Sequence, residues 1–292
     1  MKIGIIGFDT SHSHVFPAYF REMAKTDPRC NTLQVELGWP GDPSTAVHPE
    51  ELDTMRKNIS DMGIKAVNNL DELITQCDAF MLESVNGDTH LELAKKILPA
   101  KKPTFIDKPF ANNIADAKEI ARLAAHYGTP CWSSSALRFE PNMLENIKKA
   151  GQCLETDIYG PTPYFEKGRG IVYYGIHTSE MILTIMGTGL KSVRTTWHED
   201  REIIIGTWND GRMATLRGRR KPMHGFGGTI HGTEGSFSFI GNGDFYGGLT
   251  RNLANFFLNG DIPVSMDQTV EVIAFLDAAV HSKELSGKEI LV

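Results

Sequence analysis

The chain has 292 residues, of which 41% are hydrophobic and 23% are charged, and its formal net charge is −6. This composition is globular, so it excludes a disordered chain, and the negative charge argues against a duplex nucleic acid as a partner. No apolar run approaches the length of a membrane span, and the four cysteines form no CxxC pair. We therefore expect a cytoplasmic protein without membrane contact, disulfide framework or cysteine-rich zinc site.

The first half of the chain alternates predicted strands and helices. Pro17 fits best in the first turn of a helix, so we expect the first helix to begin at residues 14–16, after a turn longer than a standard phosphate-binding turn. Thr89 and Glu92 form the pattern of a capping box at the start of the fourth helix. Repeated strand–helix pairs predict a doubly wound parallel sheet over residues 1–129. The predicted strands are residues 2–7, 33–37, 65–67, 79–85 and 104–106, and the predicted helices are 14–24, 50–62, 70–76, 89–98 and 113–127.

The second half has a different pattern, which predicts an α+β domain with an antiparallel sheet over residues 130–292. Asn209, Asp210 and Gly211 supply turn chemistry between two of its strands. Trp197 and Trp208 lie on these strands and are more typical of a core or an interface than of a platform for sugars. The predicted strands are residues 192–198, 202–208, 212–218, 229–231 and 236–240, and the late helices are 249–258 and 267–284.

Residues 7–14 read GFDTSHSH and follow the first predicted strand, where a dinucleotide-binding fold places its glycine-rich turn. Gly7 keeps the first glycine position, whereas Asp9 and His12 occupy the other two. A carboxylate facing a pyrophosphate is repulsive, so we expect Asp9 to point away from it or to accept hydrogen bonds from backbone N–H groups. Thr10 and Ser11 can donate their hydroxyls to phosphate in place of some glycine contacts.

Two other interpretations of this turn stay open. His12 or His14 could be charged by a bound anion, or could coordinate a metal together with Asp9. The segment could also be a helix cap whose polar side chains are satisfied within the protein. Of the three, we expect a cofactor turn that is built differently, and we expect no metal.

Lys108 directly follows a buried strand in FIDKPF, residues 105–110. Its ammonium is expected at the carboxyl edge of the sheet, where open α/β folds bind ligands. There it could hydrogen-bond a substrate hydroxyl or stabilise negative charge that develops on oxygen, with Asp107 orienting it. The alternative is a solvated lysine at the start of a loop.

His177 opens a helical pattern in GIVYYGIHTSEMILTIMG, residues 170–187. A histidine in the first turn of a helix is well placed to act as a general base, and Glu180 lies one turn further along the same face. The alternative is a histidine near the helix cap without a chemical role.

Four further polar residues have weaker claims. Arg138 could bind a substrate or fix a domain interface, and His90, in the first turn of a helix, is more typical of a structural histidine. His224 and His231 flank a glycine-rich run that could form a pocket wall or a hairpin.

Five segments, in this order, carry a resemblance to a known family. They are KIGIIG at the start, N-x-x-T-H from Asn86, KPTFIDKP from Lys102, R-F-x-P from Arg138, and G-x-H-x-x-E from Gly175. The chain resembles the glucose–fructose oxidoreductase / inositol dehydrogenase / rhizopine-catabolism (Gfo/Idh/MocA) family over essentially its whole length, as a divergent member. The resemblance implies an N-terminal Rossmann domain, a C-terminal α+β domain with an open, mainly antiparallel sheet, and NAD- or NADP-dependent oxidation or reduction of a sugar or polyol carbon.

The resemblance also implies roles for individual residues. Lys108 matches the family's lysine, which contacts the nicotinamide side and the reacting hydroxyl, and His177 matches the histidine usually assigned as acid/base. Tyr173 stands where the family often carries an aspartate; a tyrosine can donate a proton but cannot pair with an imidazolium, so we expect it to assist His177 or to replace the aspartate. Expected cofactor-binding residues are Gly7, Thr10, Ser11, His12, Glu36, Asn86, His90, Asp107 and Lys108, and expected substrate-binding residues are Arg138, Tyr174 and Glu180. Glu36, near the end of the second strand, is expected at the ribose, and the absence of an arginine immediately after that strand slightly favours NAD over NADP.

The sequence therefore predicts an NAD(P)-dependent oxidoreductase that acts on a sugar, polyol or related hydroxy compound by hydride transfer. One alternative is a non-redox lyase, epimerase or hydrolase on the same scaffold. The other is a non-catalytic sugar- or nucleotide-binding protein, which the altered glycine turn and the missing aspartate favour. Because an open sheet face commonly meets another copy, we also expect a homodimer or homotetramer through the C-terminal sheet.

Overall fold

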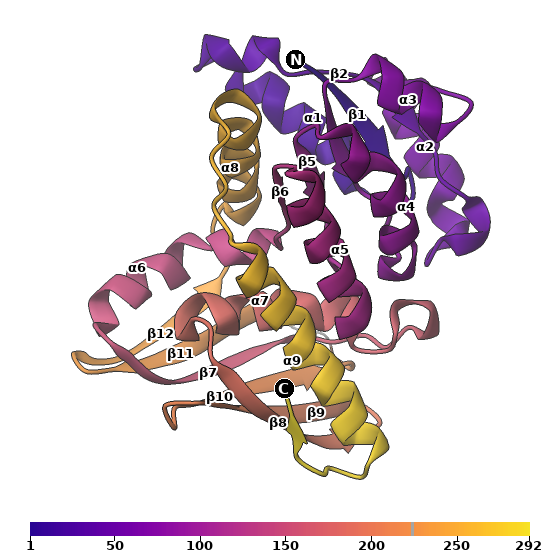
Figure 1. Ribbon diagram of the computed structural model, residues 1–292. Helices are drawn as coiled ribbons and strands as arrows, with labels where there is room; N and C mark the ends of the chain where they lie inside the picture. Colours follow the sequence, from indigo (N-terminus) through magenta and orange to yellow (C-terminus); the bar gives the residue numbers. More distant parts are fainter. Residues whose placement is uncertain (223–224) are drawn as a thin grey trace. The chain divides into compact units, whose positions relative to one another are not determined.

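The computed structural model describes residues 1–222 and 225–292, which cluster into two compact units (Figure 1). Unit 1 contains residues 1–111, 115–134 and 250–266, and unit 2 contains residues 112–114, 135–249 and 267–292. The chain thus returns to unit 1 for one late segment. The division into an N-terminal domain, residues 1–129, and a C-terminal domain, residues 130–292, stays a prediction. Within the described residues, no helix is both long enough and apolar enough to cross a membrane.

Unit 1 is built on a six-stranded parallel sheet with the order β3-β2-β1-β4-β5-β6. Its central strands are apolar and fully buried, as expected for a sheet covered on both faces. The chain reverses its direction of winding between β1 and β4, so the carboxyl ends of these strands border the crevice where such sheets bind ligands. This arrangement confirms the predicted Rossmann fold. The strands are β1 Lys2–Ile6, β2 Gln34–Trp39, β3 Lys65–Ala66, β4 Ala79–Leu82, β5 Thr104–Ile106 and β6 Cys131–Trp132.

Five helices connect these strands, and a sixth, α8 (Phe245–Asn259), joins them late in the chain. Residues 250–259 of α8 belong to unit 1, where Phe256 meets Trp132 edge-on with ring centroids 6.0 Å apart. Phe257 meets Phe20 in the same way at 6.4 Å, so this segment completes the unit 1 core. The connecting helices are α1 His12–Met23, α2 Leu52–Asp61, α3 Leu70–Gln76, α4 His90–Ile97 and α5 Ile114–Tyr127.

Two predictions for the start of these helices are wrong. Helix α1 begins at His12, so Pro17 lies in its interior and the turn before it is no longer than a standard dinucleotide turn. Thr89 forms no capping box, because its side chain makes no cap hydrogen bond to α4. Its hydroxyl donates instead to the carbonyl oxygen of Asn86 and lies 3.0 Å from the hydroxyl of Ser84, which holds the loop after β4.

Unit 2 contains a seven-stranded sheet with the order β12-β11-β7-β10-β9-β8-β13. All neighbours pair antiparallel except β7 and β10, which confirms the predicted open and mainly antiparallel sheet. The sequence analysis missed β7 and the helix before it, α6 (Pro141–Ala150). The strands are β7 Cys153–Pro161, β8 Leu190–His198, β9 Arg201–Trp208, β10 Met213–Arg219, β11 Phe226–Gly232, β12 Gly235–Gly241 and β13 Ile290–Leu291.

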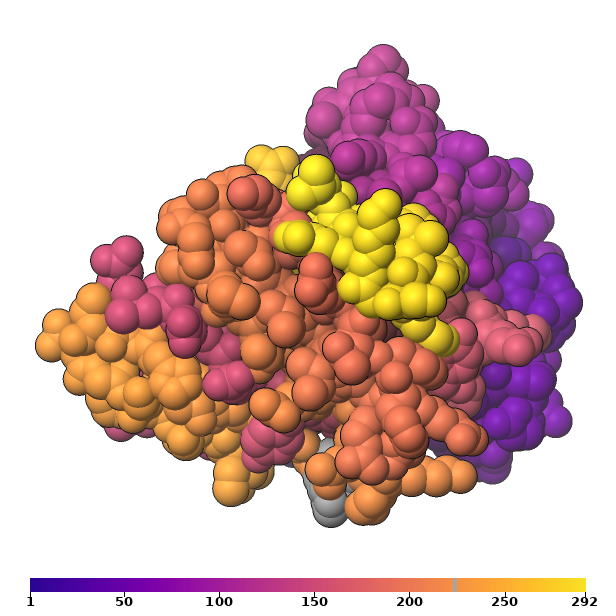
Figure 2. All heavy atoms as spheres, turned by 90° about the horizontal axis from the view of Figure 1, so that it is seen from below, coloured from indigo at the N-terminus to yellow at the C-terminus, as the bar shows by residue number. Residues whose placement is uncertain are grey.

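One face of this sheet is covered and the other is open. Helix α7 (Val172–Met186) packs on β7 and β10, and its residues are almost all buried. Figure 2 shows unit 2 from the opposite side, where atoms of the orange strands β9–β12 form much of the surface. Tyr159, Met213 and Ile240 are large hydrophobic side chains exposed on β7, β10 and β12. This open face is the one through which we predict that copies of the chain associate.

Candidate functional site

The turn between β1 and α1 accepts only glycine at its first position. Gly7 has a φ of +96°, and a Cβ added there would lie 2.6 Å from the backbone nitrogen of Ser84. Its own N–H donates to the carbonyl oxygen of Trp39 over 2.9 Å. The turn is therefore held tightly between the carboxyl ends of β2 and β4, as in a dinucleotide-binding fold.

The carboxylate of Asp9 is held by the loop that follows β4. It accepts from the backbone N–H of Val85, with the closer oxygen at 3.3 Å, which is one of the two expected arrangements. Burial is the largest influence on this carboxyl and raises its pKa above the ordinary value. Thr10 is buried and accepts from the N–H of His12 over 3.2 Å, whereas Ser11 is partly exposed at the helix N-cap. Ser11 makes no side-chain cap hydrogen bond, so its hydroxyl is compatible with a phosphate contact.

The His12 side chain is turned toward the end of β5. Its Nδ1 lies 2.6 Å from Oδ2 of Asp107, and both side chains are buried. Burial alone would raise the pKa of Asp107, but the charge and hydrogen bond of His12 outweigh it and hold that pKa below its usual value. Both residues were predicted to bind the cofactor, and this stays a prediction; in the structure their side chains bind each other.

Glu83 is a third member of this cluster, and the sequence analysis missed it. It directly follows β4, is fully buried, and lies with His12 and Asp107 so that one ligand atom from each falls within 4.8 Å of the others. Burial and the neighbouring Asp107 raise its pKa well above the ordinary value. A glutamate inside the apolar run AFMLESV was the signal that could have drawn attention to it.

Lys108 follows Asp107 at the carboxyl edge of the sheet, as predicted, and it is 7% exposed. Its charge acts on three carboxylates: it opposes the rise in the pKa of Asp9 and Glu83, and it helps to hold the pKa of Asp107 low. A solvated lysine, the alternative considered above, does not describe this environment. The ammonium is a cation beside three carboxylates. In this position it can stabilise negative charge on a bound ligand.

Three other residues expected at the cofactor have different positions. His90 is fully buried, with Nε2 2.7 Å from the carbonyl oxygen of Ser84 and Nδ1 3.1 Å from that of Phe110, so it fastens two loops together. Asn86 caps the short turn at residues 87–89 by accepting from the N–H of Asp88. Glu36 lies inside β2, three residues before its end, which disfavours the predicted contact with ribose.

His177 lies near the start of α7 and is 8% exposed. Its Nδ1 is 2.6 Å from the hydroxyl of Ser135, which also accepts from the N–H of Leu137 over 3.2 Å. When this hydroxyl accepts the Nδ1 proton, Nε2 keeps its lone pair and can take a proton; when it donates, Nε2 carries the proton and can release it. Ser135 therefore contacts the ring of His177 at Nδ1 and can hold its orientation, and this residue was not predicted from the sequence.

The tyrosine beside His177 is Tyr174. Its ring centroid is 4.8 Å from that of His177, and burial raises the pKa of its phenol. The ring of Phe226 lies 6.2 Å from that of Tyr174 and 5.6 Å from that of His177. Tyr173, the residue predicted to assist catalysis, packs on Phe165 at 5.0 Å. Of the two tyrosines, the contacts favour Tyr174 as the partner of His177.

Arg138 and Glu180, both expected at the substrate, form a buried ion pair. The guanidinium Nε donates to Oε2 of Glu180 over 2.6 Å, and the backbone N–H of Ser135 donates to Oε1 over 3.3 Å. Burial raises the pKa of Glu180, and the charge of Arg138 opposes that rise. The pair joins the 3₁₀ turn Ala136–Phe139 to α7, so it positions Ser135 against His177 and carries a structural role.

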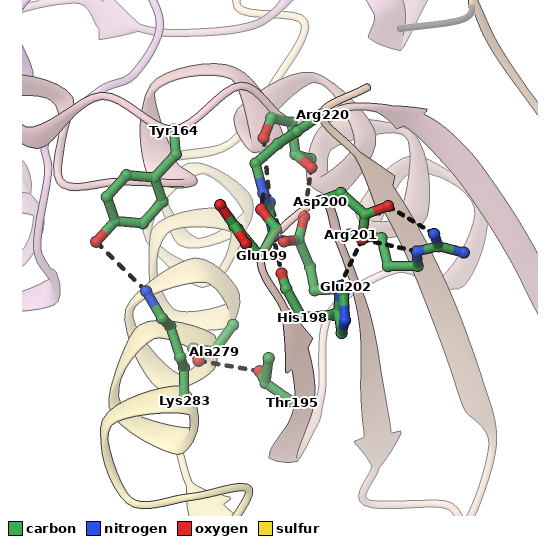
Figure 3. A network of polar contacts seen from close by, with 11 residues as sticks. Tyr164, Thr195, His198, Glu199, Asp200, Arg201, Glu202, Arg220, Ala279 and Lys283 are labelled. Carbon is green, nitrogen blue, oxygen red and sulfur yellow. Dashed lines mark hydrogen bonds and ion pairs between the residues drawn. The ribbon is translucent and has the colours of Figure 1, made fainter. Parts of the chain in front are cut away.

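Two residues that pack on Trp197, Arg220 and Lys283, belong to a separate polar network in unit 2, shown in Figure 3. Arg220 lies 3.9 Å and Lys283 lies 3.6 Å from the centroid of the Trp197 ring, and Lys283 also donates to the hydroxyl of Tyr164 over 3.4 Å. Arg220 forms an ion pair with the buried Glu202 and donates to two carbonyl oxygens of the β8–β9 turn, those of His198 and Glu199. The ring is thus used for internal packing, as is Trp208, whose Nε1 donates to the carbonyl oxygen of Gly187.

His231 lies on β11, with Nδ1 2.8 Å from the hydroxyl of Ser236 on the neighbouring strand β12. His224 lies outside the described residues.

Comparison with known proteins finds a family match for the N-terminal part of the chain. Residues 1–135 match the model of a family described as an oxidoreductase family with an NAD-binding Rossmann fold. The predicted resemblance to the Gfo/Idh/MocA family is therefore supported over these residues. A curated relative, the uncharacterized oxidoreductase YhhX of Escherichia coli (strain K12), is 30% identical over 138 residues. That match covers 42% of this chain and 40% of the relative, so less than half of the relative's length is spanned.

Solved structures show that the family fold extends over both units. A putative myo-inositol dehydrogenase from Sinorhizobium meliloti 1021 covers 100% of this chain and 99% of its own, with a TM-score of 0.79 and 17% identity. The myo-inositol dehydrogenase from Lactobacillus casei, solved with NAD(H) and myo-inositol, covers 100% and 96%, with a TM-score of 0.77 and 14% identity. The UDP-N-acetylglucosamine 3-dehydrogenase GnnA from Acidithiobacillus ferrooxidans covers 98% and 99%, with a TM-score of 0.76 and 15% identity. These likenesses confirm the predicted two-part fold.

Proposed function

We propose that this chain is an NAD(P)-dependent oxidoreductase that transfers hydride between the nicotinamide and a CH–OH carbon of a small, hydroxyl-rich substrate of the sugar or polyol class. The observation that carries the proposal is the turn at residues 7–11. It combines an obligatory glycine, a carboxylate that accepts from the backbone N–H of Val85 and a hydroxyl at the N-cap of α1. The relatives whose names state a substrate act on inositol or on a nucleotide sugar, which supports the substrate class.

The residues of unit 1 fit a dinucleotide. The backbone of the turn and the hydroxyl of Ser11 would hold the pyrophosphate at the positive end of α1. For the ribose, Asp42 replaces Glu36 in our assignment, because it lies just beyond the end of β2. It also follows Gly41, where an added Cβ would be only 3.6 Å from the Cα of Gly7. No arginine lies between β2 and Arg56, and a carboxylate at Asp42 repels a 2′-phosphate, so we propose a preference for NAD over NADP.

The chain's own residues handle the proton and the charge, while the bound nicotinamide supplies the hydride acceptor. His177 takes the proton of the reacting hydroxyl during oxidation and returns it during reduction, with Ser135 fixing the ring. Lys108 stabilises the negative charge that develops on the reacting oxygen. Tyr174 shapes the surroundings of His177 from one side of the imidazole.

A screen with oxidised nicotinamide tests this function. We expect at least one polyol, sugar or nucleotide sugar to give an increase in the absorbance of reduced nicotinamide. Lys108→Met should lower kcat by about 10²- to 10³-fold, because it removes the group that stabilises the alkoxide. Lys96→Met, a change at an exposed lysine on α4, is the control and should leave the rate unchanged. Conversion of a substrate without any net change in nicotinamide absorbance would contradict the proposal and favour a non-redox enzyme.

A further inference from the structure

Three buried side chains that the proposed hydride transfer leaves unexplained meet at the carboxyl edge of the unit 1 sheet. Glu83 directly follows β4, Asp107 directly follows β5, and His12 opens α1. They are 0%, 1% and 5% exposed, respectively. The backbone N–H of Glu83 donates to the carbonyl oxygen of Ile6 over 2.7 Å, and that of Asp107 donates to the carbonyl oxygen of Leu82 over 2.8 Å. Both acidic residues are therefore fixed to the neighbouring strand through their backbone. The cluster is thus carried by rigid elements.

Among the described residues, three carboxylate oxygens of this cluster have no hydrogen-bond partner, whereas Oδ2 of Asp107 lies 2.6 Å from Nδ1 of His12. Within the described part of the chain, neither side-chain oxygen of Glu83 has a hydrogen-bond partner, and Oδ1 of Asp107 has none. Two buried carboxylates in this condition are costly, and each needs a compensating group. A proton shared between them would satisfy one oxygen of each and leave the second oxygen of Glu83 without a partner. A cation can coordinate all three oxygens at once.

We propose that the His12–Glu83–Asp107 cluster binds one divalent transition-metal cation. One imidazole nitrogen with carboxylate oxygens suits Zn²⁺ or Mn²⁺ better than Ca²⁺ or Mg²⁺, which prefer oxygen ligands alone. One ligand atom from each residue already lies within 4.8 Å of the others. The site uses His12 and Asp107, which the sequence analysis assigned to the cofactor, and Glu83, to which it assigned no role.

Metal binding would replace the proton between His12 and Asp107. Nδ1 of His12 and Oδ2 of Asp107 are 2.6 Å apart, the separation of a short hydrogen bond. Two ligands of one ion, each at about 2.1 Å and at a right angle, lie about 3 Å apart. A small side-chain movement therefore converts the hydrogen-bonded pair into a ligand pair, and a neutral imidazole then carries its proton on Nε2.

The test measures metal binding by the full chain in the absence of nucleotide, so it succeeds or fails independently of the proposed oxidoreductase function. Chelator-treated protein is titrated with ZnCl₂ or MnCl₂ by calorimetry, and the bound metal is counted by elemental analysis after dialysis. We expect one tightly bound ion per chain, with weaker binding of MgCl₂. Glu83→Gln and His12→Asn should each weaken this binding by at least about 100-fold, because each removes a direct ligand.

His14→Asn is the matched control, since His14 lies with His12 in the first turn of α1 but outside the cluster. Circular dichroism shows whether the variants fold, and the wild-type chain gives a second measurement that does not depend on them. That measurement is elemental analysis of the dialysed wild-type chain, which should find about one zinc or manganese ion per chain. Absence of binding by the wild-type chain, or equal binding by wild type, Glu83→Gln and His12→Asn, would overturn the proposal and leave a shared proton as the compensation for Glu83.

Discussion

Replacing His177 with asparagine is expected to lower kcat by about 10²- to 10⁴-fold, the range over which a general acid–base group contributes. The imidazole is the proton carrier of the proposed reaction, and asparagine keeps a polar side chain but cannot take up the proton. The rate is measured with the nicotinamide and the substrate that the screen identifies. KM for the nicotinamide should change little, because His177 belongs to unit 2 and the cofactor residues belong to unit 1.

The partner and the control for this experiment are both present in unit 2. Ser135→Ala removes the contact at Nδ1 and should cost up to about 10²-fold in kcat through misplacement of the ring. His231 has the same kind of contact, from Nδ1 to a serine hydroxyl at 2.8 Å, so His231→Asn and Ser236→Ala are matched controls that should leave kcat unchanged. If His177→Asn retains more than a tenth of the wild-type kcat, another group carries the proton.

Breaking the Arg138–Glu180 ion pair is expected to cause the largest loss of stability. Arg138→Met leaves the fully buried Glu180 carboxylate with only a backbone N–H donor, at 3.3 Å. Removing one partner of a buried pair costs about 3–5 kcal/mol in the free energy of unfolding. The loss of stability is measured by urea unfolding and followed through tryptophan fluorescence, to which Trp197 and Trp208 of unit 2 contribute.

Two comparisons show whether burial is the cause. The double variant Arg138→Met with Glu180→Met should lose less stability than Arg138→Met alone, since it leaves no unpaired charge. Lys149→Met breaks an exposed pair between Lys149 and Glu145 on α6, and it should cost no more than about 1 kcal/mol. Equal effects of Arg138→Met and Lys149→Met would contradict the structural role given to the buried pair.

The order of strands and helices in unit 1 could be predicted because each buried strand is a short apolar run closed by a polar residue or glycine. Lys108 follows directly from this pattern, since it stands immediately after β5. The start of α1 could not be predicted from Pro17. Proline prefers the first turn of a helix, but α1 begins at His12 and contains Pro17 in its interior. The partners of His12 and Asp9 could not be predicted either, since they lie just beyond the ends of β5 and β4, respectively, far along the chain.

In unit 2 the position of His177 on a buried helix was evident from its apolar neighbours. Its orienting partner was not, because Ser135 is 42 residues away and lies in a polar segment that shows no periodicity. For the same reason Tyr173 was chosen by its spacing from His177, whereas the packing of the rings brings Tyr174 to the imidazole. Strand β7 was missed because its polar residues interrupt the alternation that marks the other strands.

The central claim is that residues 7–14 form a working dinucleotide turn in spite of Asp9 and His12. It is tested most directly by titrating the purified full chain with NADH and NADPH and following the fluorescence of the nicotinamide. The account predicts micromolar binding, tighter for NADH than for NADPH. Absence of binding for both reduced and both oxidised forms would contradict it, and would show that these two substitutions have abolished the cofactor site.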